Sequence, residues 1–191
     1  MDRIQRALAV AFEQHRGQTR KAGGTPYIVH ILDVARLLLS EPGVSEDVIA
    51  AGILHDVLED THYTARQLEQ DFGPAVLSLV LFATEPEKGP QTTRQEKVRT
   101  WRARKTHTIE ACVTASRDQL LVLLADKLSN LASIQEELHL RGDAIWNSFN
   151  AAKEDIAWYH RTLRAALADK LQDTRLFRLY TRLVDQFVAT P

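Results

Sequence analysis

Four side chains that can bind a metal ion interrupt three apolar segments of this sequence. His30 lies within YIVHILDVA, the pair His55-Asp56 follows VIAAGIL, and Asp126 lies within LLVLLADKLSNLASI. Burying charged groups costs free energy unless they are paired or bind a cation. Two imidazoles and two carboxylates form a mixed nitrogen and oxygen ligand set that suits Mn²⁺, Fe²⁺ or Zn²⁺. The sequence therefore predicts a divalent-metal site assembled from three helices.

Two further carboxylates, Glu59 and Asp60, follow His55 and Asp56 by one helical turn. In an uninterrupted helix residues i and i+4 share a face, so His55 would stack on Glu59 and Asp56 on Asp60. All four side chains would then face one site. A bound metal lowers the pKa of its water and stabilises charge on a phosphoryl oxygen. We therefore predict that Glu59 and Asp60 activate or orient a water molecule.

Each of these features also has a structural interpretation. His30 could be a core or capping histidine, and Asp126 could simply pair with its neighbour Lys127. The acidic stretch 55–60 could be a solvated helix face, although its apolar flanks argue against that. The metal site is favoured because three separate segments each place ligand-type groups among apolar residues.

The elements that must position these residues are helices. Apolar residues recur at helical spacing in nearly every segment, and none alternates convincingly as a strand would. Ser45 and Thr64 are expected as N-caps, and Pro74 at a helix start. The fold class is thus all-α, a single domain of residues 1–191 with roughly eight or more helices. The expected helices cover 3–17, 28–39, 46–60, 65–73, 74–84, 94–115, 117–138, 151–167 and 174–188.

Composition narrows the class of protein. The 191 residues include 24 Lys and Arg against 25 Asp and Glu, a balance that gives no support to a general nucleic-acid partner. The single cysteine, Cys112, cannot form an internal disulfide and is expected in the core of a protein from a reducing compartment. No secretory signal is present, and no apolar run approaches the roughly 18 residues that span a bilayer. We expect a soluble cytoplasmic protein without a membrane partner.

Several motifs together resemble a known family. The sequence is similar to the HD-domain metal-dependent phosphohydrolases, within them to the hydrolase domain of RelA/SpoT-type alarmone enzymes, and most closely to the stand-alone small alarmone hydrolases. The similarity covers most of residues 1–160 and leaves 161–191 as C-terminal helices that pack either on their own domain or on a second copy in a homodimer. The motifs are HRGQTRKAGGTPYIVH (15–30), AAGILHDVLEDT (50–61), FGPAVLSLV (72–80), TEPEKG (84–89), WRARK (101–105) and LLADKLSNL (123–131).

The resemblance implies an HD-domain helical bundle that removes the 3′-pyrophosphate of guanosine tetra- or pentaphosphate through a metal-activated water. It implies Mn²⁺, with Fe²⁺, Zn²⁺ or Co²⁺ as alternatives, and a small nucleotide as the partner. Arg104 and Lys105 resemble a basic pair that could reach the diphosphates, although they could equally form a solvated helix face. The resemblance makes His30, His55, Asp56 and Asp126 the metal ligands, Glu59 and Asp60 the residues that activate water, and Arg20, Lys21 and Asn130 contacts to the nucleotide.

The sequence departs from the family pattern at three places. Ser129 stands where many members have histidine, Ile31 follows the first metal histidine where proline is usual, and the loop 22–26 is one residue longer than in the large bifunctional enzymes. Because of these departures, the identity of the nucleotide substrate stays open. The alternatives are an adenine alarmone, a nucleoside tri- or monophosphate, or NADPH. A further alternative is a non-catalytic nucleotide-binding regulator.

Overall fold

The computed structural model describes residues 2–20, 23–85 and 93–189, without the side chains of residues 94 and 97. Within these residues the chain forms ten α-helices, one 3₁₀-helix and no strand, apart from an isolated bridge between Thr19 and Pro26. The predicted all-α fold is confirmed. The helices are α1 (Arg3–Gln14), α2 (Ile28–Leu39), α3 (Glu46–Leu54), α4 (Val57–Asp60), α5 (Ala65–Phe72), α6 (Pro74–Ala83), α7 (Arg94–Ala111), α8 (Arg117–Arg141), η1 (Gly142–Ser148), α9 (Lys153–Leu171) and α10 (Arg175–Ala189).

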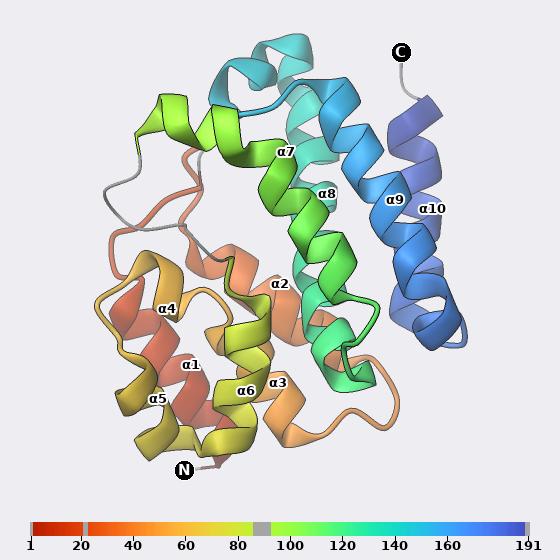
Figure 1. Ribbon diagram of the computed structural model, residues 1–191. Coiled ribbons are helices and arrows are strands. Elements are labelled where there is room, and N and C mark those ends of the chain that lie inside the picture. Colours follow the sequence, from red (N-terminus) through yellow and green to blue (C-terminus); the bar gives the residue numbers. More distant parts are fainter. Residues whose placement is uncertain (1, 21–22, 86–92, 190–191) are drawn as a thin grey trace.

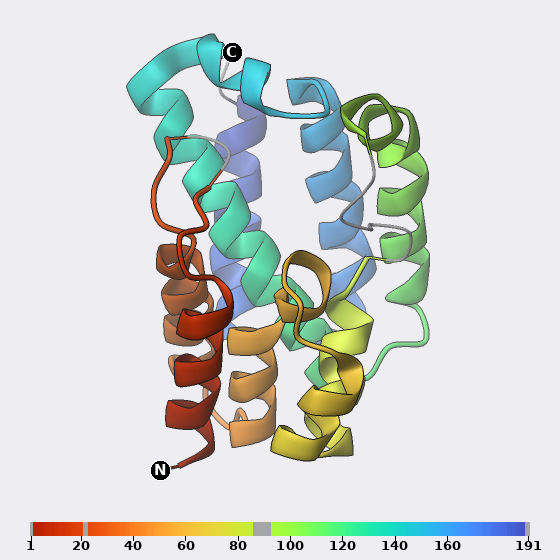
Figure 2. The same cartoon turned by 90° about the vertical axis from the view of Figure 1, so that its left-hand side faces the viewer.

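Helix α8 joins the two halves of the bundle. Helices α1 to α6 gather at one end, and α7, α9 and α10 lie at the other (Figures 1 and 2). Helix α8 contacts α2, α3 and α6 on one side, and α9 and α10 on the other. Residues Leu120 to Asp126 of α8 are all buried, which explains why an apolar run there surrounds a carboxylate. The segment that carries Asp126 thus crosses the middle of the molecule.

Close packing of α2 on α3 depends on a glycine. A methyl group added at Gly52 would overlap the Leu38 Cδ1 methyl and lie 3.3 Å from Val34 Cγ1. Because Leu38 and Val34 are fully buried, neither can move aside without repacking the core. Gly52 therefore sets the approach of the two helices that carry His30 and lead into His55.

Local sequence signals explain most helix boundaries. The Ser45 hydroxyl accepts from the Val48 amide, and Thr64 forms a capping box with Gln67, as expected for N-caps. Pro74 occupies the first turn of α6. A 3₁₀-helix over 142–148, which the sequence did not predict, follows α8.

The remaining elements close the core. Helix α10 packs on α8 and α9 of the same chain and buries Leu176, Tyr180, Val184 and Phe187. Cys112 is buried as predicted, and burial raises the pKa of its thiol to about 11. No helix among the described residues is long and apolar enough to cross a bilayer.

Candidate metal centre and active site

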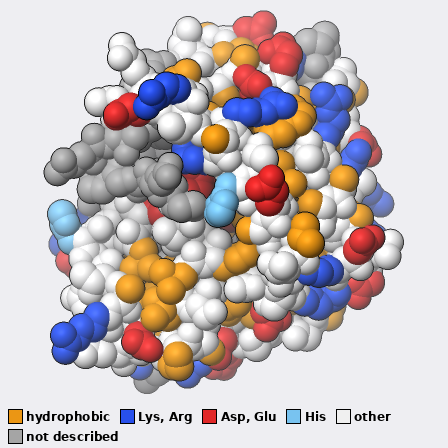
Figure 3. Space-filling model, in the orientation of Figure 1, with side chains coloured by type: hydrophobic (Ala, Val, Ile, Leu, Met, Phe, Trp, Pro, Cys, Tyr) orange, Lys and Arg blue, Asp and Glu red, His pale blue; other side chains and the backbone are white. Residues whose placement is uncertain are grey.

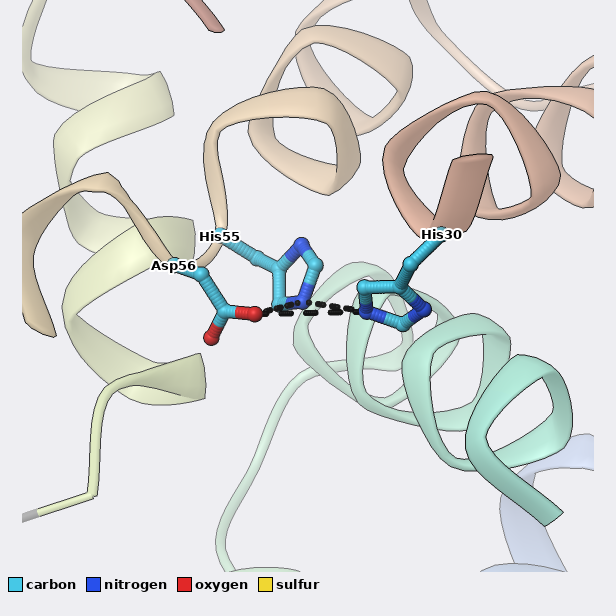
Figure 4. A group of neighbouring side chains, drawn as sticks. All are labelled: His30, His55 and Asp56. Atoms are coloured by element: carbon cyan, nitrogen blue, oxygen red, sulfur yellow. Dashed lines mark hydrogen bonds and ion pairs between the residues drawn. The ribbon is translucent and has the colours of Figure 1, made fainter. Parts of the chain in front are cut away.

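The four predicted ligands come together at one point of the bundle. His30 projects from α2, His55 and Asp56 lie in the turn between α3 and α4, and Asp126 projects from α8. The Nε2 atoms of His30 and His55 are 3.2 Å apart, and Asp56 Oδ2 lies 2.9 Å from His55 Nε2 (Figure 4). Asp126 Oδ1 lies 3.4 Å from His30 Nε2 and 3.6 Å from His55 Nε2. Two imidazole nitrogens and two carboxylates therefore face a common centre.

These distances fit a set of ligands around one ion. Ligand atoms about 2.1 Å from a transition-metal ion lie about 3.0–3.5 Å apart when they are neighbours. Four of the measured separations fall between 2.9 and 3.6 Å, and His30 Nε2 to Asp56 Oδ2 is 3.9 Å. His30, His55 and Asp56 also form a compact group able to hold a metal ion. The donor set and its spacing suit a divalent cation.

The segment 46–60 is not the continuous helix that the sequence predicted. Helix α3 ends at Leu54, α4 begins at Val57, and Asp56 takes a φ of −102° and ψ of −2° between them. The His55 imidazole competes for the helix backbone, because its Nδ1 lies 2.8 Å from the Gly52 carbonyl oxygen. The prediction of an uninterrupted helix, from which the stacking of His55 on Glu59 and of Asp56 on Asp60 was inferred, is therefore wrong. The interruption lets two adjacent residues both face the cluster.

Hydrogen bonds to the outer ring nitrogens fix both imidazoles. His55 Nδ1 donates to the Gly52 carbonyl, and His30 Nδ1 lies 2.9 Å from the Ser129 hydroxyl oxygen. A proton on each Nδ1 leaves each Nε2 lone pair directed at the cluster, which is the tautomer that binds metal. Ser129 lies three residues after Asp126 on α8, so one helix supplies a carboxylate of the cluster and the group that orients His30. Sequence reasoning treated Ser129 only as a departure.

Asp126 pairs with its neighbour Lys127, as its structural interpretation expected, and it also faces the two imidazoles. Its Oδ2 accepts from Lys127 Nζ at 2.6 Å, whereas Oδ1 faces the imidazoles and accepts from the Asn130 amide. Burial alone would raise the pKa of Asp126, but Lys127 and the two imidazoles outweigh it and hold the pKa well below its usual range. A carboxylate that stays ionised is the form that binds a cation.

Electrostatics also separates the two imidazoles. Burial lowers the pKa of His30, so its ring stays neutral. Burial alone would lower the pKa of His55 too, but Asp56 and Asp126 outweigh it and raise that pKa. The surplus negative charge that produces this shift is the charge that a divalent cation would compensate.

Tyr27 is a site residue that sequence reasoning missed. Its hydroxyl donates to Asp56 Oδ2, and its ring stacks on His15 with centroids 4.9 Å apart. Burial, and then the Asp56 charge, raise the pKa of Tyr27, which keeps the hydroxyl protonated. The available signal was its position three residues before His30, which puts both on one side of the chain as α2 begins.

The two water-activating candidates differ in their surroundings. Glu59 is buried, and its Oε1 accepts from the Glu85 amide. Asp60 is exposed, and its backbone carbonyl accepts from Gln18 Nε2 at 2.7 Å. Both line the pocket beside the cluster. Glu59 is therefore the carboxylate held in place, and Asp60 lies nearer to solvent.

A cavity of about 520 Å³ opens beside the cluster, a volume suited to a small-molecule ligand. Near the centre of the face in Figure 3, acidic and basic side chains lie close together. Arg20 and Asn130 line this cavity, and Arg20 Nη2 donates to Asn130 Oδ1 at 2.9 Å. Lys21 lies outside the described residues.

Arg104 and Lys105 also line the cavity rather than a solvated helix face. The exposed fractions of their side chains are 10% and 14%. Arg104 Nη1 pairs with Glu85 Oε2, and Lys105 Nζ pairs with Glu85 Oε1. Tyr159 is both a core residue, 3% exposed, and part of the cavity wall. Basic and aromatic groups thus face the carboxylate-rich cluster across one pocket.

The motifs and the cluster geometry agree with a match to known sequences. A family model described as "HD domain" matches residues 7–157, which is most of the chain. The chain belongs to the HD domain family. The predicted membership of this family is confirmed.

Relatives of this HD domain include both short and long proteins. It is 33% identical over 176 residues to guanosine-3′,5′-bis(diphosphate) 3′-pyrophosphohydrolase MESH1 from Danio rerio, covering 88% of this chain and 89% of that protein. It is also 33% identical over 192 residues to a GTP pyrophosphokinase from Streptomyces coelicolor. That match covers 97% of this chain but only 21% of the relative. The HD domain thus spans about a fifth of the long relative and nearly all of the short one.

Solved structures show the same fold. One is a metazoan ortholog of SpoT described as hydrolysing ppGpp, with a TM-score of 0.73, 27% identity, and coverage of 97% of this chain and 96% of that one. Another is lmo0812 from Listeria monocytogenes EGD-e, with a TM-score of 0.70, 32% identity, and coverage of 82% of this chain and 97% of that one. The arrangement of helices in this chain is therefore similar to that in both solved structures.

Proposed function

We propose that this protein is a metal-dependent hydrolase that removes the 3′-pyrophosphate from guanosine tetra- or pentaphosphate. The observation that carries the proposal is the convergence of His30, His55, Asp56 and Asp126 beside a cavity that also contains Glu59. The similarity over nearly the full length of a relative named as a guanosine-3′,5′-bis(diphosphate) 3′-pyrophosphohydrolase supports this choice of substrate. We place the activity in the cytoplasm, since a lone buried cysteine suits a reducing compartment.

The proposed ligands of the ion are the four residues of the cluster. Mn²⁺ is the proposed metal because imidazole and carboxylate ligands suit it, and Fe²⁺, Zn²⁺ and Co²⁺ are the alternatives. A divalent ion bound there would act as a Lewis acid that lowers the pKa of a water molecule and neutralises phosphoryl charge.

The protein's own residues position the reactants. Water attacks the phosphorus next to the 3′-oxygen, and the bond between this phosphorus and the 3′-oxygen breaks. The products are a free 3′-hydroxyl and pyrophosphate. Glu59 accepts a proton from the water, and Asp60 orients it. Arg20 and Asn130 hold the nucleotide, with Lys21 as a further proposed contact. Arg104 and Lys105 neutralise the phosphates, so the residues act mainly by positioning and electrostatics.

Product analysis tests this proposal. Purified protein with Mn²⁺ is incubated with guanosine tetraphosphate, its adenine analogue, nucleoside tri- and monophosphates, and NADPH, and products are separated by chromatography. We expect guanosine 5′-diphosphate and inorganic pyrophosphate in equal amounts. Faster turnover of another nucleotide would overturn the choice of substrate. Tight nucleotide binding without turnover in any divalent metal would show a regulator instead.

A further inference from the structure

Glu85 differs from the other acidic residues of the pocket. The described lining includes four cations, Arg20, Arg104, Lys105 and Lys127, and five carboxylates, Asp56, Glu59, Asp60, Glu85 and Asp126. The proposed metal and water account for every carboxylate except Glu85. A pocket for a nucleotide with several negative charges gains nothing from an additional carboxylate in its wall unless that carboxylate has a separate role.

The contacts of Glu85 resemble those of a phosphate group. One of its carboxylate oxygens accepts from Arg104 and the other accepts from Lys105. A guanidinium and an ammonium held on two oxygens of one anion is also how proteins bind phosphate. The three side chains are only 9–14% exposed, so the pairs are largely shielded from water.

Other groups extend this anion-binding surface. Lys127 lies within electrostatic reach of Glu85. Burial lowers the pKa of Lys127, but Asp126, then Tyr159 and Glu85, outweigh it and raise that pKa. Lys105 Nζ lies 5.0 Å from the centre of the Tyr159 ring. The Tyr159 hydroxyl is buried and has no hydrogen-bond partner among the described residues. An unpaired buried hydroxyl is costly, and here it lies in the wall of a proposed ligand pocket.

Glu85 is also placed where its side chain can move without moving the catalytic carboxylate. It follows Thr84, the C-cap of α6, and lies outside any helix. Its backbone amide, not its side chain, donates to Glu59. Rotation of the Glu85 side chain would therefore leave the hydrogen bond to Glu59 in place.

We propose that Glu85 is a placeholder for a diphosphate group: its carboxylate occupies the subsite formed by Arg104 and Lys105 in the free protein, and a diphosphate of the nucleotide displaces it. Two adjacent, poorly solvated cations would repel each other without an anion, and Glu85 compensates for them until substrate arrives. The identity of the nucleotide in this proposal rests on the proposed function. The binding of a diphosphate by Arg104 and Lys105 does not.

The sign of the effect distinguishes a placeholder from a purely structural ion pair. Glu85→Gln removes the competing charge, so we expect its affinity for inorganic pyrophosphate to rise about tenfold. We also expect a lower melting temperature without ligand and a larger rise with pyrophosphate than in the wild type. Asp155→Asn is the matched control, because it removes an exposed carboxylate that also pairs with α7, through Arg102. That control should change neither affinity nor the melting shift.

Binding is measured by thermal shift and calorimetry with inorganic pyrophosphate, which need no turnover. Unchanged or weaker pyrophosphate binding by Glu85→Gln would overturn the placeholder. If the wild type hydrolyses guanosine tetraphosphate and Glu85→Gln gains nothing, the placeholder fails while the proposed function stands. If the wild type hydrolyses no nucleotide but Glu85→Gln binds pyrophosphate more tightly, the proposed function fails while the placeholder stands.

Steady-state kinetics assign the diphosphate. Guanosine 3′-diphosphate with a free 5′-hydroxyl is compared with guanosine tetraphosphate. A lower KM of Glu85→Gln for both substrates would support displacement by the 3′-diphosphate. A lower KM for the tetraphosphate alone would support displacement by the 5′-diphosphate. An unchanged or higher KM for both would contradict displacement by either.

Discussion

Ser129 and His30 lie 99 residues apart in sequence, yet the Ser129 hydroxyl oxygen is 2.9 Å from His30 Nδ1. Both groups are buried, and the hydrogen bond turns His30 Nε2 toward the carboxylates. Helix α8 therefore contributes the proposed ligand Asp126 and also orients a second proposed ligand, His30 on α2. Residues that orient a metal-binding histidine contribute to the affinity of the site for its metal.

Removing this hydroxyl should weaken the metal site without unfolding the protein. For Ser129→Ala we expect Mn²⁺ affinity to fall about tenfold or more, because His30 loses the partner that fixes its tautomer. Calorimetric titration of the metal-free protein measures this. Ser40→Ala is the control: among the described residues its hydroxyl bonds only the Arg36 carbonyl oxygen, at the far end of α2, so affinity should stay unchanged. Equal affinities for all three proteins would show that Ser129 does not orient a ligand.

Substitution of Gly52 should lower both the stability of the core and the metal affinity of the site. In Gly52→Ala the new methyl group meets Leu38, and we expect a loss of about 1–3 kcal/mol in the free energy of unfolding. Mn²⁺ affinity should fall as well, because α3 leads into His55. Gly73→Ala provides the comparison: its φ of +88° makes alanine unfavourable, but beyond its chain neighbours no atom of the described residues lies within 4 Å of the new methyl group. It should lose stability and keep its metal affinity; a Gly52→Ala protein with normal metal affinity would refute the coupling.

Arg20 should act on the nucleotide rather than on the metal. Its guanidinium donates to Asn130 inside the cavity and touches none of the four ligands in the described hydrogen bonds and ion pairs. A charged hydrogen bond contributes about 1.5–3 kcal/mol, so Arg20→Ala should raise KM about tenfold or more. The Mn²⁺ content should not change. Steady-state kinetics with elemental analysis on the same sample would expose a different role if metal were lost too.

Buried His160 should make stability fall in mild acid. Its Nδ1 lies 2.7 Å from the Tyr180 hydroxyl, and burial, then Lys127 and Lys105, lower its pKa from 6.5 to about 3. Below pH 6.5 His160 becomes protonated in the unfolded chain but stays neutral in the folded protein. Stability therefore decreases as pH falls from 6.5 toward 3. At about pH 5.5 the cost is about 1.4 kcal/mol relative to about pH 8.

Urea unfolding of the wild type and His160→Gln at both pH values checks this contribution. The variant should lose less stability on acidification, by about 1.4 kcal/mol, because glutamine does not titrate. Other titrating groups are common to both proteins and cancel in the comparison. Parallel pH profiles would contradict a neutral, buried His160.

Much of the fold could be predicted from residue patterns. Apolar periodicity indicated the all-helical class and gave Ile28–Leu39 with the bounds that α2 has. Ligand-type residues within apolar helices identified the cluster, because burial of such groups needs compensation. These signals are local, so one sequence suffices to read them.

The parts that failed depend on contacts between distant segments. Periodicity predicted one helix over 46–60, but the His55 side chain takes the Gly52 carbonyl and interrupts it. Nothing in the sequence near Ser129 shows that it contacts His30, and the position of Tyr27 before His30 does not show that its hydroxyl reaches Asp56. The pairing of Glu85 with Arg104 and Lys105 likewise requires the packed structure.

The most direct test of the central claim measures Mn²⁺ content and pyrophosphate release from guanosine tetraphosphate on the same protein samples. We predict that the wild type holds one ion per chain and releases pyrophosphate, and that Asp126→Ala loses both. Glu59→Gln should keep the ion and lose about 10²–10⁴-fold in turnover, because it removes only the proton acceptor. Full metal content with normal turnover in Asp126→Ala would contradict the claim that these side chains hold the ion that drives the reaction.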